Sequence, residues 1–133
     1  KGDLDSAEQG FRTKLKSQPN NADALGGLGV VRMQQNDYVQ AEQLLTRAAR
    51  MKPQWNKTLN ATRYWKLVND ASAARTNGDL VTARRAVESA IRLDSRTAAA
   101  HTLLGQIQAH SGQLDQAEKT FSQVLNRDRG NVD

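Results

Sequence analysis

The chain has 133 residues, 38% hydrophobic and 25% charged, so it can bury a modest core and is too apolar to stay disordered. It has no cysteine, which excludes disulfides and thiolate metal sites, and no apolar run reaches the ~18–20 residues of a membrane span. The formal net charge is +5, and a run of basic residues without an acid lies between Glu42 and Asp70. The run contains Arg47, Arg50, Lys52, Lys57, Arg63 and Lys66. It is either a solvated helix surface or a patch for an anionic or polar partner.

Four segments along the chain repeat one pattern: "GDLDSAEQGF", "NDYVQAEQLL", "GDLVTARRAV" and "GQLDQAEKTF". Each has a turn residue, an apolar residue two positions later, an alanine, and a larger apolar residue four positions further. The alanines are Ala7, Ala41, Ala83 and Ala117, spaced by 34, 42 and 34 residues. A 34-residue period of two amphipathic helices resembles the tetratricopeptide repeat. The alanine lets two helices cross closely, and the larger residue fills the space between them.

The pattern predicts seven helices and no strands, an all-α tetratricopeptide-repeat α-solenoid. In chain order the helices cover about residues 3–17, 22–35, 39–51, 57–76, 80–93, 98–110 and 114–127. Residues 1–55 then form a half repeat plus one full repeat, 56–63 an insertion, and 64–133 two repeats. A chain that starts on half a repeat and has no polar capping helix is expected to be a piece of a longer array. We expect its exposed repeat ends to pair, which would produce a homo-oligomer.

The first helices of the pairs follow the W-x2-L-G-x2-Y pattern of the repeat unevenly. "LGGLGVVR" and "HTLLGQIQ" place Gly29 and Gly105 in register with its glycine. In "LVNDASAA", Asp70 stands where leucine is usual, so we expect this helix to pack its neighbour differently or less tightly.

The insertion adds eight residues, slightly more than two helical turns, before the third unit. Either the helix at 57–76 begins early, with Asn56 as its cap, or residues 56–62 form a separate short helix with a kink before Tyr64. The absence of proline and glycine from this stretch favours the long helix. In both cases the next pair cannot stack at the standard rotation, so we predict a hinge here. The predicted hinge residues are Asn56, Lys57, Thr58, Leu59, Asn60, Ala61 and Thr62.

Three aromatic residues in this region, Trp55, Tyr64 and Trp65, do not follow from the repeat pattern. They either fill the wider space around the long helix or form a binding platform. An indole face can stack on a pyranose ring, and neighbouring basic groups can donate hydrogen bonds to hydroxyls. The predicted contact residues for a glucan or a protein partner are Trp55, Arg63, Tyr64, Trp65 and Arg75.

The residue types of the common catalytic and cofactor sites are not grouped in this sequence. His101 and His110 lie nine residues apart, which is not a zinc spacing, and there is no nucleophile–base–acid arrangement or phosphate-binding glycine loop. We therefore predict no enzyme, no metal and no cofactor. Acids and bases alternate outside the insertion, which argues against a nucleic-acid partner.

A narrower resemblance rests on "GDLDSAEQGFRTKLKSQPNNADALGGLG", on "NDYVQAEQLLTRAARMKP", and on the overlong gap ending "TRYW" before "NGDLVTARRAVESAIRLD". These segments resemble the repeat region of the bacterial cellulose-synthase C subunit, with Arg63, Tyr64 and Trp65 as the marker of that family. The resemblance implies a non-catalytic periplasmic scaffold within a larger outer-membrane protein. Its implied partners are other cellulose synthase subunits and other periplasmic proteins. The resemblance also implies contact with the cellulose chain, which the scaffold would guide toward an outer-membrane pore.

The alternative function is a generic tetratricopeptide adaptor that holds a helix or an extended peptide. Chaperone adaptors of this class clamp a peptide carboxylate with Lys and Asn on successive first helices. That clamp is missing here, because the inner-facing residues are Asp23, Gly26 and Val30 in one unit and Ala99, Thr102 and Gln106 in another.

Overall fold

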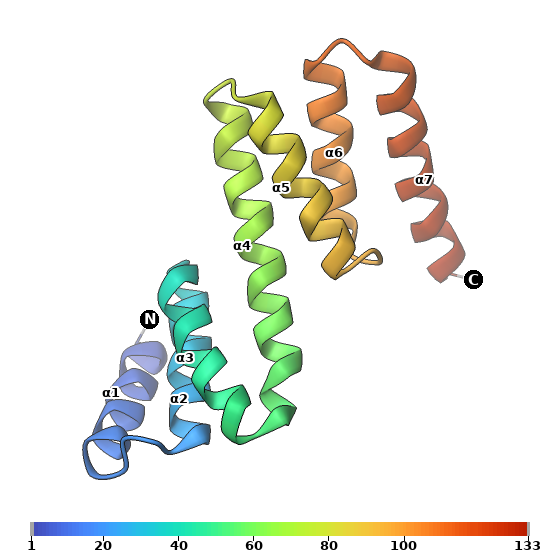
Figure 1. The fold of residues 1–133 in the computed structure, drawn as a ribbon. Coiled ribbons are helices and arrows are strands. Elements are labelled where there is room, and N and C mark those ends of the chain that lie inside the picture. Colours follow the sequence, from blue (N-terminus) through green and yellow to red (C-terminus); the bar gives the residue numbers. More distant parts are fainter. Residues whose placement is uncertain (1, 133) are drawn as a thin grey trace. The chain divides into compact units, whose positions relative to one another are not determined.

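The computed structural model describes residues 2–132 of the chain, and side chains as far as residue 127. These residues form seven α-helices and one short 3₁₀ turn, η1, and contain no strand (Figure 1). The elements are α1 (Gly2–Ser17), α2 (Ala22–Gln34), α3 (Tyr38–Met51), η1 (Pro53–Trp55), α4 (Asn56–Thr76), α5 (Leu80–Leu93), α6 (Ala98–His110) and α7 (Leu114–Val132). The predicted all-α fold and its seven helices are confirmed. The largest difference is at α7, which continues beyond the predicted end at residue 127.

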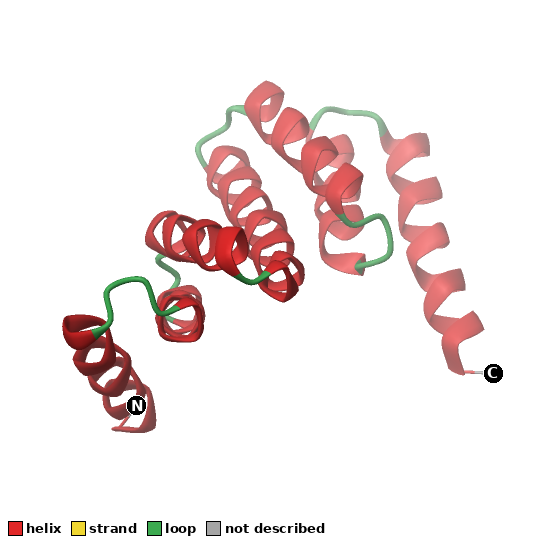
Figure 2. Cartoon of the chain, turned by 60° about the horizontal axis from the view of Figure 1, so that its bottom comes forward, coloured by secondary structure: helices red, strands yellow, loops and turns green. Residues whose placement is uncertain are grey.

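The chain divides into two compact units, and the boundary falls inside α4, between Arg63 and Tyr64. Unit 1 contains α1, α2, α3 and the first two turns of α4. Unit 2 contains the rest of α4 with α5, α6 and α7. Short loops join the helices of each unit (Figure 2).

Three of the tight turns within helix pairs use the same backbone geometry. Asn36, Gly78 and Gly112 have φ values of 63°, 81° and 81°, in the left-handed region where glycine and asparagine are tolerated best. In each turn the next residue donates its N–H to a carbonyl five residues back: Asp37 to Arg32, Asp79 to Ala74, and Gln113 to Gln108. Three of the four turn residues identified in the sequence therefore reverse the chain as expected, whereas the fourth, Gly2, is the first residue of α1.

The core of unit 1 combines α2, α3 and the start of α4. Ala41, Leu45 and Ala49 are buried together with Leu59, and Met33 packs against them. Gly29 on α2 allows the close approach of α3: a Cβ atom there would lie 2.7 Å from Cγ of Leu45. The small-against-large packing that the repeat pattern predicted is thus present.

The core of unit 2 combines three helices. Tyr64 and Ala71 of α4 pack with Val87 of α5 and Ile107 of α6, and all four are buried. Asp70, which replaces the usual leucine, is exposed. The same helix instead buries Tyr64 in this core, so its packing differs from that of the other first helices, as expected.

The insertion lies within one unbroken helix of 21 residues, α4, and not in a separate short helix (Figure 1). Asn56 is not its N-cap, which corrects the prediction. Its φ and ψ of −60° and −35° are helical, because η1 runs directly into α4. Leu59 and Thr62 are buried within unit 1. The two extra turns therefore complete the core of unit 1, and bending at residues 56–62 stays a prediction.

Candidate functional site

Trp55 is held against α2 in unit 1. A Cβ atom at Gly26 would lie 2.3 Å from Cε2 of Trp55, so the indole occupies the space that the glycine leaves open. Its Nε1 donates a hydrogen bond to Oδ1 of Asp23 at 3.1 Å, and Nζ of Lys52 lies 2.6 Å from Oδ2. These two donors, Lys52 above all, hold the pKa of Asp23 below its ordinary value. Trp55 thus has a structural role, fixing the path from α3 into α4.

We predict that Gly26→Ala displaces the Trp55 indole toward solvent. The new methyl group needs the space of the ring, and the partly exposed ring can leave more easily than the helix backbone can move. In a Trp65→Phe background, where Trp55 is the sole tryptophan, the emission spectrum should shift to the red. The same substitution at Gly10, which has no heavy atom within 4 Å of a built Cβ, should leave the spectrum unchanged. An unshifted spectrum for Gly26→Ala would contradict the packing described here.

Several residues of the basic run form ion pairs or hydrogen bonds within unit 1. Arg63 donates from Nε to Oε2 of Glu42 at 2.9 Å, and Lys52 pairs with Asp23. Arg47 donates to the backbone oxygen of Pro19. These contacts favour the interpretation of the run as a solvated helix surface over a continuous patch for an anion.

Tyr64 is buried in unit 2 and caps α6 from a different helix. Its hydroxyl accepts a hydrogen bond from the N–H of Ala100 at 3.0 Å and donates one to the carbonyl oxygen of Thr97 at 3.2 Å. Thr97 is the N-cap residue of α6, but its own side chain makes no capping bond. The Tyr64 hydroxyl therefore does for α6 what the side chain of Asn21 does for α2, where it accepts from the N–H of Ala24. A side chain that is only 2% exposed has no surface to offer a ligand.

Trp65, the next residue, is 38% exposed. Its ring packs edge-on against Tyr64, with centroids 5.1 Å apart and planes at 86°. Because Tyr64 is fixed in the core, it holds the exposed indole in a defined orientation. Arg75 lies three turns further along α4, and its Nη1 is 3.5 Å from Nδ1 of His110 on α6.

The five predicted contact residues therefore do not form one site within either unit. Trp55 and Arg63 belong to unit 1, where each has a structural partner. Tyr64, Trp65 and Arg75 belong to unit 2, where Trp65 presents the most accessible apolar surface of the three.

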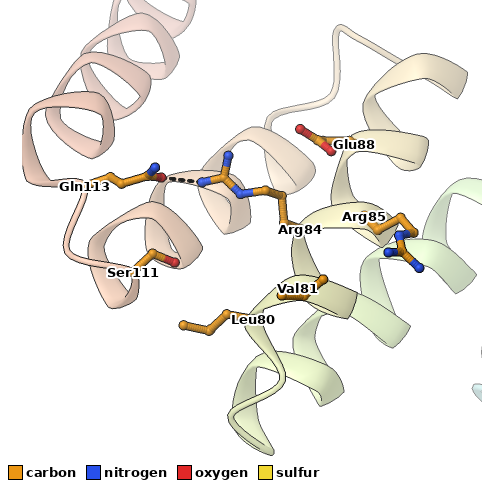
Figure 3. A pocket seen from close by; sticks show the side chains of 7 residues that line it. All are labelled: Leu80, Val81, Arg84, Arg85, Glu88, Ser111 and Gln113. Carbon is orange, nitrogen blue, oxygen red and sulfur yellow. Dashed lines mark hydrogen bonds between the residues drawn. The ribbon is translucent and has the colours of Figure 1, made fainter.

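The structure also contains surface grooves that were not predicted from the sequence. One, of about 340 Å³ in unit 2, is shown in Figure 3. Arg84 extends from α5 toward the turn before α7 and donates a hydrogen bond to Gln113. Arg85 and Glu88 contribute opposite charges to the same lining. Another, between α1, α2 and α3 of unit 1, is lined by three arginines. The residues that line each of these two grooves come from different helices or turns. Predicting them from the sequence would have required both the face of each helix and the pairing of the helices.

An apolar groove of about 510 Å³ lies between α1 and α2 in unit 1, lined in part by Leu4, Phe11 and Val30. It lies at the half repeat, one of the repeat ends for which pairing of two copies was predicted, and that pairing stays a prediction. Among the described residues, no group of three or more histidine, aspartate or glutamate side chains could hold a metal ion. None of the helices described here is both long and apolar enough to cross a membrane.

Within each unit, helices joined by tight turns pack through small residues, which defines the class as an all-α protein of repeated helix pairs. The sequence profile of the tetratricopeptide repeat matches residues 1–69 and 74–133. The chain belongs to the tetratricopeptide repeat family.

Curated relatives confirm the narrower resemblance. The chain is 38% identical over 129 residues to "Cellulose synthase operon protein C" of Xanthomonas axonopodis pv. citri (strain 306), covering 97% of this chain and 8% of the relative. It is 38% identical over 134 residues to the protein of that name in Pseudomonas fluorescens (strain SBW25), covering 99% of this chain and 10% of the relative. For "Cellulose synthase 1 operon protein C" of Komagataeibacter xylinus the identity is 31%, over 98% of this chain and 10% of the relative. The chain thus spans a small part of the length of these relatives.

Solved structures with a similar fold include MamA, with a TM-score of 0.60 at 18% identity, covering 98% of this chain and 92% of MamA. The structure titled "MamA 41-end from Desulfovibrio magneticus RS-1" has a TM-score of 0.54 at 17% identity, covering 97% of this chain and 88% of that one. At these identities the likeness concerns the fold alone.

Proposed function

We propose that this chain is part of a non-catalytic scaffold for bacterial cellulose synthesis and export, in which its repeats bind partner proteins. The observation that carries the proposal is the 38% identity to cellulose synthase operon protein C across 97–99% of the chain in two bacteria. The partners would be other cellulose synthase subunits or other periplasmic proteins. The location would be the periplasm, as part of a larger outer-membrane protein.

An in-frame deletion of this segment in the bacterium that carries the gene tests the scaffold role. Cellulose released outside the cell, measured as glucose after cellulase digestion, should fall strongly. Replacement by the matching segment of the Xanthomonas relative should restore it. Unchanged cellulose output after the deletion would reject the proposal in favour of a generic adaptor. Alkaline phosphatase fused to the segment, which is active only outside the cytoplasm, tests the location.

We further propose that Trp65 is the residue of unit 2 that touches the glucan. Its indole is exposed and held in orientation by Tyr64, which suits stacking on a sugar ring. In a Trp55→Phe variant the fluorescence comes from Trp65 alone, so titration with cellohexaose reports on this site directly. Saturable quenching or enhancement is expected. No change at any concentration, with the variant folded by circular dichroism, would remove glucan contact and leave the protein-binding role intact.

A further inference from the structure

The groove between α1, α2 and α3 has a volume of about 510 Å³, and its lining residues come from one face of each helix. Gln40, Gln43, Leu44 and Arg47 of α3 line it, with the i, i+3, i+4, i+7 spacing of a single helix face. Leu28 and Arg32 of α2 line it one turn apart, and α1 contributes Arg12. Most of these residues lie on α1 and α3, the second helices of their pairs, so the groove is separate from the first-helix face where a carboxylate clamp would be.

The groove carries surplus positive charge. Three arginines line it and no carboxylate does. Glu8 pairs with both Arg12, at 3.1 Å, and Arg32, at 2.9 Å, so one acid is shared by two bases. Arg47 has no carboxylate within 4.0 Å among the described residues, and it donates to the Pro19 carbonyl. An anionic ligand would restore the balance of charge.

The three arginines differ in how far they are fixed. The Arg32 side chain is only 12% exposed, and it donates to Glu8, Gln35 and Gln40. It is therefore a rigid charged wall with few donors to spare. Arg12 and Arg47 are exposed, so their guanidinium groups can turn toward a ligand and take a carboxylate in two-point contact.

The remaining lining distinguishes between classes of anion. Leu28 and Leu44 offer aliphatic surface, and Gln40 and Gln43 carry amides that can both donate and accept, as a peptide backbone requires. No aromatic side chain lines the groove. Sugars and nucleic-acid bases are usually held by stacking on aromatic rings, so neither fits this lining as well as a peptide does.

We propose that this groove binds an extended acidic peptide segment of a partner protein. Carboxylates of the peptide pair with Arg12 and Arg47, and its aliphatic side chains cover Leu28 and Leu44. The inference is independent of the cellulose assignment, because it uses only the shape and charge of unit 1.

The test uses the full chain and a fluorescein-labelled peptide of about eight residues that alternates glutamate with leucine, whose side chains point to opposite sides when extended. The groove variant is Arg12→Gln with Arg47→Gln. Its matched control is Arg50→Gln with Lys57→Gln, which removes the same charge from exposed positions of unit 1 outside the groove. Circular dichroism checks that both variants keep their helices.

By fluorescence anisotropy at low salt, we expect the groove variant to bind about tenfold more weakly than wild type and the control to differ by less than about twofold. Replacing glutamate by glutamine in the peptide, or leucine by serine, should also weaken binding. Equal losses in both variants would show only attraction to net charge and would overturn the proposal. So would an absence of binding to wild type, or undiminished binding of the glutamine or serine peptide.

Discussion

Tyr64→Phe should destabilise unit 2 by about 1–3 kcal/mol, although it removes a single oxygen atom. The hydroxyl is buried, and its loss leaves the N–H of Ala100 without an acceptor and the carbonyl of Thr97 without its donor. Thr97, the N-cap residue of α6, makes no side-chain cap of its own, so the capping contact present in the structure comes from Tyr64. Guanidinium unfolding followed by circular dichroism measures the change.

Tyr38→Phe is the matched control for this prediction. The Tyr38 hydroxyl donates to Oδ1 of Asn36 at 3.3 Å in an exposed position, so its removal should change the free energy of unfolding by less than about 0.5 kcal/mol. Similar effects for the two substitutions would show that the Tyr64 hydroxyl, which caps α6, stabilises the protein no more than an exposed hydroxyl does.

The same site predicts a loss of stability in alkali. Burial raises the pKa of the Tyr64 hydroxyl, and the Ala100 N–H offsets this only in part. The folded state therefore resists ionisation, while the unfolded chain ionises near the ordinary value of 10.0. The contribution of the buried, neutral Tyr64 hydroxyl to the free energy of unfolding is complete below that pH. It is lost as the pH rises through the folded-state pKa. Tyr64→Phe should lack this alkaline component in otherwise identical unfolding experiments.

Gly29→Ala and Gly10→Ala should change stability in opposite directions, although both replace glycine by alanine inside a helix. At Gly29 the new Cβ would lie 2.7 Å from Cγ of Leu45, which is fully buried, and 3.4 Å from the carbonyl oxygen of Ala41. Overpacking of this kind costs about 1–3 kcal/mol, which exceeds the ~1 kcal/mol gained in helix propensity. We expect a net loss of about 1–2 kcal/mol.

At Gly10 in α1, a Cβ atom would meet no heavy atom within 4 Å. Only the propensity gain remains, so we expect Gly10→Ala to stabilise the protein by about 0.5–1 kcal/mol. Thermal unfolding of the two variants side by side separates packing from propensity. A stabilising Gly29→Ala would mean that α2 and α3 can separate to admit a methyl group, against the close approach described here.

The local pattern of the sequence determined the helices of this protein, the turns between them and the positions where they approach. Glycine or asparagine at each turn, an alanine five residues after it, and a larger apolar residue one helical turn later are all short-range signals. Each acts through the steric limits of neighbouring residues, so each can be read without knowing the rest of the fold. The resemblance to cellulose synthase operon protein C likewise rests on the linear order of residues.

Only the tertiary structure decided the roles of the insertion and of the aromatic residues that flank it. No pattern along the chain shows that Tyr64 caps α6, because its partners Thr97 and Ala100 lie 33 and 36 residues away. The packing of Trp55 against Gly26 depends in the same way on which helix faces meet, and so does the groove between α1, α2 and α3. A side chain's role as ligand contact or structural support is set by what lies against it in space, and that is fixed only when the helices pack.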